Sequence, residues 1–224
     1  MTLGTNRHGD VAGRPGGTVR RGFGLRSLGR ALCSVTGLLA GLAVVAALVP
    51  GAAEALELDR DLVAAQPWRI VGGHLVHFSI QHLVWDLVVL VGLGLACERR
   101  WPGRTLLALG LAVPVISFLF LGCAPHLDTY RGLSGLGSTL LVLLAVGLHR
   151  EGVFRSVWTR HLPLLSALGF LAKVAFELGQ GSAVFVQQAD LFEPVPLAHL
   201  VGGTIGLLLG AVPADRPAGV LELE

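Results

Sequence analysis

Three side chains in apolar surroundings have the chemistry to hydrolyse an amide bond: Ser134, His199 and His82. A serine hydroxyl is a poor nucleophile until a neighbouring base removes its proton. A neutral imidazole, whose pKa lies near working pH, suits that task. A second imidazole can donate a hydrogen bond to the oxyanion that forms on the attacked carbonyl. These residue types therefore indicate a serine hydrolase, provided that the fold brings them together.

The elements that must position these residues are membrane helices. The chain has 224 residues, of which 53% are hydrophobic and only 14% charged, and its mean hydropathy is +0.69. Such a composition indicates lipid rather than water as the solvent. About 20 apolar residues cross a bilayer as a helix, and long apolar runs without strand alternation exclude a barrel. We therefore predict an all-α bundle with about six transmembrane helices, at roughly 31–50, 78–97, 104–123, 132–148, 161–179 and 195–212.

Arginines are distributed unevenly between the loops of these spans. With a cytoplasmic N-terminus, the inner segments carry 13 arginines, whereas the outer loops carry only Arg60, Arg69 and Arg131. Positive residues are enriched on the cytoplasmic side, which predicts that both termini lie inside. Residues 1–30 are expected to form a disordered basic tail, 31–212 the membrane domain and 213–224 a short inner tail. Arg20-Arg21 before an apolar stretch also resembles a twin-arginine signal, but five further spans favour a first membrane helix.

Polar residues inside membrane spans are costly and therefore candidates for function. The second, fourth and sixth predicted spans all run from outside to inside, and His82, Ser134 and His199 lie near their outer ends. Topology alone thus places the three side chains at a similar depth. The glycines around Ser134 and a stripe of three at Gly202, Gly206 and Gly210 favour close packing of the fourth and sixth spans.

These motifs resemble those of the rhomboid family of intramembrane serine proteases. Gly132-Leu133-Ser134-Gly135 is similar to its GxSG motif, His199 with Gly202 and Gly206 to its HxxGxxxG motif, and His77 with His82 to its HxxxxH span. The likeness covers about residues 68–210. It implies a catalytic Ser134–His199 dyad, with His82 and backbone N–H groups near Leu133 in the oxyanion hole. It implies no cofactor and no metal.

Two positions depart from the family pattern. Asp86 occupies the position of the family's oxyanion asparagine. An ionised carboxylate would repel an oxyanion, so Asp86 must be protonated, turned away or used differently, for example to orient a histidine. Ser138 replaces the aromatic residue that follows the family's nucleophile by four positions, so another group must hold His199.

Within the family, the chain looks most like the rhombosortases, which are thought to process proteins with C-terminal Gly-Gly sorting tails. The segments around Trp68–His74 and Tyr130–Gly135, with Lys173 and Glu177, carry this likeness. Lys173 and Glu177 are one helical turn apart and are expected to form an ion pair, either structural or in contact with substrate. The implied partners are the lipid bilayer and single-span membrane proteins, not nucleic acid, and the implied location is a bacterial inner membrane.

Other readings of the same residues remain open. The chain could be a catalytically inactive rhomboid relative that binds membrane proteins. His74, His77, His82 and His199 could ligate haem, although this leaves Ser134 unexplained. A transporter could use Lys173 and Glu177, but the chain shows no inverted repeat. Cys33, Cys97 and Cys123 lack metal-site or disulfide spacing and are expected to be buried thiols.

Overall fold

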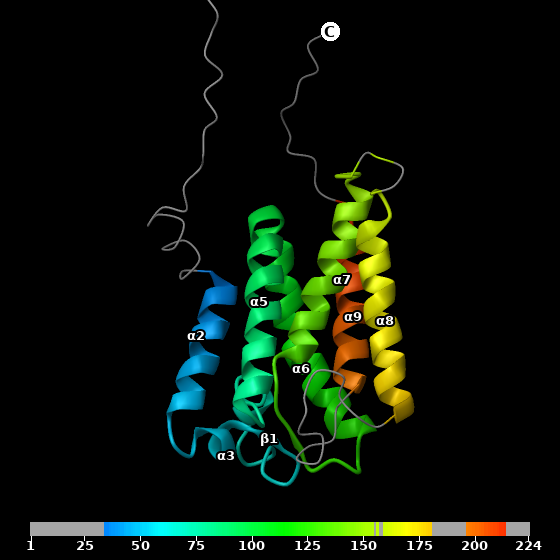
Figure 1. Ribbon diagram of the computed structural model, residues 1–224. Coiled ribbons are helices and arrows are strands. Elements are labelled where there is room, and N and C mark those ends of the chain that lie inside the picture. Colours follow the sequence, from blue (N-terminus) through cyan, green and yellow to red (C-terminus); the bar gives the residue numbers. More distant parts are fainter. Residues whose placement is uncertain (1–33, 155, 157–158, 181–195, 214–224) are drawn as a thin grey trace, which may run out of the picture.

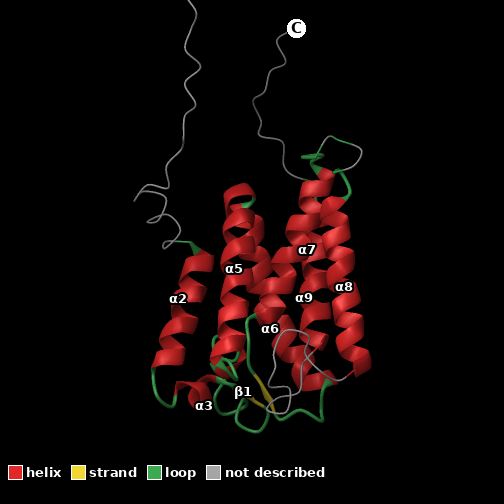
Figure 2. Ribbon diagram, in the orientation of Figure 1, coloured by secondary structure: helices red, strands yellow, loops and turns green. Residues whose placement is uncertain are grey.

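Six long helices dominate the computed structural model, which describes residues 34–154, 156, 159–180 and 196–213. Figure 1 shows them standing side by side and alternating in direction, and Figure 2 shows how little strand accompanies them. The long helices are α2 (Val35–Leu48), α5 (Ile80–Arg100), α6 (Pro102–Cys123), α7 (Ser134–Arg150), α8 (Leu162–Gln180) and α9 (Pro196–Ala211). The short elements are α3 (Ala52–Leu56), β1 (Leu58–Asp59), α4 (Arg69–Gly72) and β2 (Thr129–Tyr130).

Each long helix coincides with one of the predicted spans. By length and composition, α5 and α6 could cross a membrane on their own. The other four apolar stretches, Val35–Leu48, Ser134–Arg150, Leu162–Phe176 and Pro196–Ala211, are shorter. The first predicted span, 31–50, begins outside the described residues, as do the two predicted tails apart from Pro213. The all-α bundle is confirmed, whereas six membrane crossings and their orientation stay predictions.

The alternating directions bring the starts of α5, α7 and α9 to one end of the bundle (Figure 1). The same end holds α3, α4 and the antiparallel pair β1–β2, in which Leu58 pairs with Tyr130. Arg60 follows β1 and caps the end of α6, because its guanidinium donates to the carbonyls of Leu121 at 2.5 Å and Phe120 at 3.3 Å, and to that of Ala124, just after the helix, at 2.7 Å. The last carbonyls of a helix have no partner within it, so this contact fixes the connection to β2.

The glycine stripe of α9 packs directly on α7. A Cβ atom at Gly202 would collide with the carbonyl oxygen of Gly135, and one at Gly206 with that of Thr139. Helices approach this closely only where side chains are absent. The packing predicted from the sequence is confirmed, and it sets the relative height of the start of α7 and the start of α9.

At the other end of the bundle, α2 is tied to α5. The Thr36 backbone N–H and hydroxyl both donate to the carboxylate of Glu98, at 2.7 and 2.6 Å, and Gly94 leaves room for Thr36. A carboxylate is favourable beside the unpaired N–H groups at the start of a helix. Cys97 is buried nearby as predicted, but the prediction for Cys123 was wrong: it is exposed, because the last residue of α6 faces away from the bundle.

Candidate active site

The candidate nucleophile is the first residue of α7. The chain reaches it through Gly132, whose φ of +130° is rarely adopted by other residues. A Cβ atom at Gly132 would lie 3.0 Å from two atoms of the His82 imidazole. Glycine is therefore required here for two reasons, and its absence of a side chain lets the His82 ring lie against the backbone two residues before Ser134. The N–H groups in the first turn of a helix lack intrahelical partners, which makes this turn able to bind an anion.

Asp86 is the hub of a buried polar cluster beside this turn. Its Oδ2 accepts the Leu133 backbone N–H at 2.8 Å and lies 3.2 Å from Nε2 of His77 and 3.4 Å from Nε2 of His82. Asp86 is thus not turned away, which removes one of the three possibilities left by the sequence. The contact also engages the Leu133 N–H, a group that was expected to line the oxyanion hole.

His77 was expected as part of a motif and as one of four possible haem ligands, but not as a member of the hydrolytic site. Burial lowers the pKa of His77, and the nearby carboxylate of Asp86 partly opposes this effect. A neutral His77 would donate through Nε2 to Asp86. His77 lies close to His82 in the sequence, but nothing in the sequence indicated that both rings converge on one carboxylate.

His199 lies in the first turn of α9, buried next to α7. Its neighbour Ala198 places its carbonyl oxygen 3.2 Å from a Cβ built on Gly135, the residue after Ser134. Gly135 and Ala198 are therefore in contact, and each of them is the sequence neighbour of a candidate dyad residue, Ser134 or His199. The Phe170 ring of α8 packs edge-on to the His199 ring, with 6.3 Å between centroids. Sequence reasoning missed Phe170, because nothing distinguishes it from the other apolar residues of its helix.

The position of Ser138 has a local consequence. Its hydroxyl donates to the Ser134 carbonyl one turn earlier, at 2.8 Å, instead of supplying a ring. On α8, Lys173 is half-buried, whereas the side chain of Glu177 lies outside the described residues. The predicted Lys173–Glu177 pair therefore stays a prediction.

The loop before Ser134 is held from the opposite side by Arg131. Its guanidinium donates to the Glu57 carboxylate at 2.8 Å and lies over the Phe78 ring, 5.1 Å from the ring centre. Both charged side chains are largely buried, at 17% and 13% exposure. A charge-assisted hydrogen bond of this kind is stronger than a neutral one, so the loop is anchored on both of its sides.

A second serine–histidine contact exists, but its surroundings are structural. His74 Nε2 lies 3.1 Å from Ser117 Oγ and 3.1 Å from the Val113 carbonyl, and the Ser117 hydroxyl donates to the Ile70 carbonyl at 2.8 Å. His74 and Ser117 are 1% and 0% exposed. A substrate could not reach this serine, whose hydrogen already has an acceptor, and the pair instead joins α4 to α6.

Burial makes His74 a source of acid sensitivity. It lowers the pKa of His74 to about 4, so between pH 6.5 and pH 4 the unfolded chain binds a proton at this residue that the folded chain excludes. Folding stability therefore falls on acidification through this range, by about 3 kcal/mol in total. We expect the thermal midpoint of the detergent-solubilised protein to fall from pH 7 to pH 4 by more than that of His74→Gln. Equal pH slopes in the two proteins would contradict this assignment.

Among the described residues, no group of three or more His, Cys, Asp or Glu side chains is arranged to hold a metal ion. Comparison with known protein families gives a match. The model of the Rhomboid domain matches residues 64–216, which is most of the chain and includes α4 to α9. No curated protein sequence matches the chain.

Proposed function

The chain belongs to the rhomboid family of intramembrane serine proteases, and from this premise we propose that it is itself an active protease with Ser134 as nucleophile and His199 as base. One observation carries the proposal. The first turn of α7, with Ser134 and its unpaired N–H groups, packs on the first turn of α9, with His199, at the contact of Gly135 with Ala198. A catalytically inactive relative would have no need for this pairing of residue types.

The reaction follows from the chemistry of these groups. Ser134 Oγ attacks the carbonyl carbon of the scissile amide while His199 accepts the hydroxyl proton. The oxyanion receives hydrogen bonds from His82 and from the Ser134 backbone N–H, which begins a helix. His199 then gives its proton to the departing amine, and an ester between Ser134 and the substrate remains. Water, deprotonated by His199, hydrolyses that ester and releases the acid.

Asp86 acts in this proposal as a positioning residue. Its carboxylate accepts the Leu133 N–H and lies beside the rings of His77 and His82. A carboxylate beside an imidazole orients the ring. Asp86 thereby holds the rings of His77 and His82 and the turn before Ser134 in place, and the single N–H of a neutral His82 is left for the oxyanion, which is bound by donors other than the Leu133 N–H.

The membrane orientation completes the proposal. Family membership makes this an integral membrane protein, and the arginine distribution favours cytoplasmic termini with six crossings. The starts of α5, α7 and α9 would then face the outside, in a bacterial inner membrane. Substrates would be single-span proteins cut near the outer surface, and the likeness to rhombosortases favours a C-terminal Gly-Gly motif followed by an anchor helix.

A reporter protein tests the substrate. A helix hides its carbonyls in its own hydrogen bonds, and glycine weakens a helix by about 1 kcal/mol relative to alanine. A secreted reporter with a Gly-Gly motif, one anchor helix and a basic tail should be released when co-expressed with the enzyme. The same reporter with both glycines replaced by leucine should remain anchored. Equal release of both reporters would refute the glycine requirement. Release of neither reporter would show that the Gly-Gly assignment is wrong, and the Ser134–His199 dyad would then be tested separately.

A further inference from the structure

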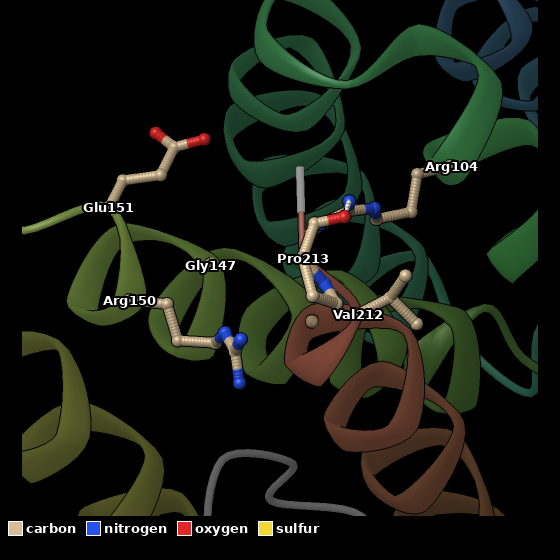
Figure 3. A pocket seen from close by; sticks show the side chains of 7 residues that line it. Arg104, Gly147, Arg150, Glu151, Val212 and Pro213 are labelled. Carbon is tan, nitrogen blue, oxygen red and sulfur yellow. Dashed lines mark hydrogen bonds between the residues drawn. The ribbon is translucent and has the colours of Figure 1, made fainter. Parts of the chain in front are cut away.

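The end of the bundle opposite Ser134 contains a cavity that the proposed protease reaction does not use. Its volume is about 210 Å³, and its walls come from the start of α6 and the ends of α7 and α9. Figure 3 shows Arg104, Arg150 and Glu151 around it, together with Gly147, Val212 and Pro213. The cavity thus combines two guanidinium groups with one carboxylate and an apolar edge.

The carboxylate is already neutralised from outside the cavity. Glu151 accepts hydrogen bonds from Arg100 Nε at 2.9 Å and from the Trp101 indole N–H at 2.7 Å. An ion pair and a second donor satisfy this carboxylate without Arg104 or Arg150. The charge that faces the cavity is therefore the positive charge of these two arginines.

Both arginines retain donors for a ligand. Arg104 lies over the Trp101 ring, 5.8 Å from its centre, and one of its nitrogens donates to the Pro213 carbonyl at 3.1 Å. A guanidinium has five N–H donors, so most of those of Arg104 remain available. In the part of the chain that the structure describes, the side chain of Arg150 makes no hydrogen bond or ion pair. Figure 3 shows its side chain extending from α7 toward the end of α9, where Arg104 arrives from α6.

We propose that this cavity binds a phosphate group of an anionic ligand between Arg104 and Arg150. The planar forks of two arginines match the several acceptor oxygens of a phosphate. The cavity volume holds one such group, and Val212 and Pro213 offer apolar contact beside it. The source is either an anionic phospholipid headgroup or soluble phosphate. The arginine-rich end of the bundle, cytoplasmic in the proposed orientation, is where anionic lipids meet basic pockets between membrane helices.

Binding can be measured without any substrate for proteolysis. The full-length protein is reconstituted in nanodiscs and analysed by native mass spectrometry with phosphatidylglycerol or phosphatidylcholine, and separately titrated with inorganic phosphate. Phosphatidylglycerol should bind more strongly than phosphatidylcholine, whose choline cation offsets the attraction. Each of Arg104→Gln and Arg150→Gln should weaken binding about fivefold, and the double variant about 30-fold, because a direct, solvent-accessible ion pair between a guanidinium and a phosphate contributes up to about 1 kcal/mol.

Arg99→Gln is the matched control, because Arg99 is exposed in the last turn of α5, at the same end of the bundle, and does not line the cavity. It removes one positive charge and should leave binding unchanged. Competition by inorganic phosphate that depends on Arg104 and Arg150 would identify soluble phosphate as a ligand of the same site, whereas its absence would identify the lipid. The proposal would be overturned if Arg150→Gln, which disturbs no described contact, bound the ligand as strongly as the wild type. It would also be overturned if Arg99→Gln lost as much binding as Arg150→Gln.

Discussion

We expect proteolysis to fall by about a thousandfold or more when Ser134 or His199 is replaced by alanine, because in the proposed reaction each substitution removes a group that forms or breaks bonds. Neither change should unfold the protein. The described hydrogen bond of Ser134 runs through its backbone carbonyl, which alanine retains. The measurement is release of a membrane-anchored reporter in cells, with the amount of enzyme in the membrane determined in parallel.

Matched substitutions separate chemistry from general disturbance. Ser166→Ala changes a serine of α8 whose hydroxyl bonds only its own helix, at the Pro163 carbonyl, and His149→Ala changes a histidine at the far end of α7. Both should keep normal activity. A fluorophosphonate probe should label the wild type and not Ser134→Ala. Labelling that persists in Ser134→Ala but disappears in Ser117→Ala would transfer the nucleophile to the buried pair with His74 and refute the proposed dyad.

Activity should fall about a hundredfold in Asp86→Ala, since the Leu133 N–H loses its acceptor and His77 and His82 lose a shared partner. Asp86→Asn keeps one oxygen for the Leu133 N–H but presents an amide to two imidazoles, so its activity should lie between that of Asp86→Ala and that of the wild type. The substrate KM should change less than kcat, because the carboxylate acts on catalytic groups rather than on the substrate.

The ordering of the three proteins distinguishes the roles open to Asp86. If the carboxyl group were protonated and donated to the oxyanion, asparagine would replace it, and Asp86→Asn would match or exceed the wild type. That result would refute the positioning role described above. Leu87→Ala is the control, since Leu87 neighbours Asp86 on α5 and lies among the partly buried apolar residues of the core; it should lower stability more than activity.

The sequence was sufficient to predict the helices and to place His82, Ser134 and His199 toward the same end of the bundle. Lipid forces long apolar runs into helices, and alternation of direction then places His82, Ser134 and His199 at one end. Contacts between segments that are distant in the sequence could not be predicted in this way. The approach of Phe170 to His199, the closure of α6 by Arg60 and the pairing of Leu58 with Tyr130 depend on how loops and helices pack.

Asp86 illustrates the same limit within one residue. Its departure from the family pattern was visible in the sequence, and its spacing of four from His82 placed both on one helical face. Its other two partners, His77 and the Leu133 N–H, come from the segment before α5 and from the loop before α7. Only the folded arrangement reveals that one carboxylate joins three segments.

The anchoring of the Ser134 loop also bears on where the folding unit of this protein begins. The family match starts at residue 64, yet the loop rests on Glu57 through Arg131 and on Leu58 through its pairing with Tyr130. Arg69, inside the match, donates to the carbonyls of Glu54 and Glu57 at 2.9 and 2.8 Å. The unit that must fold together to hold the Ser134 loop therefore includes residues 54–58, which precede the matched domain.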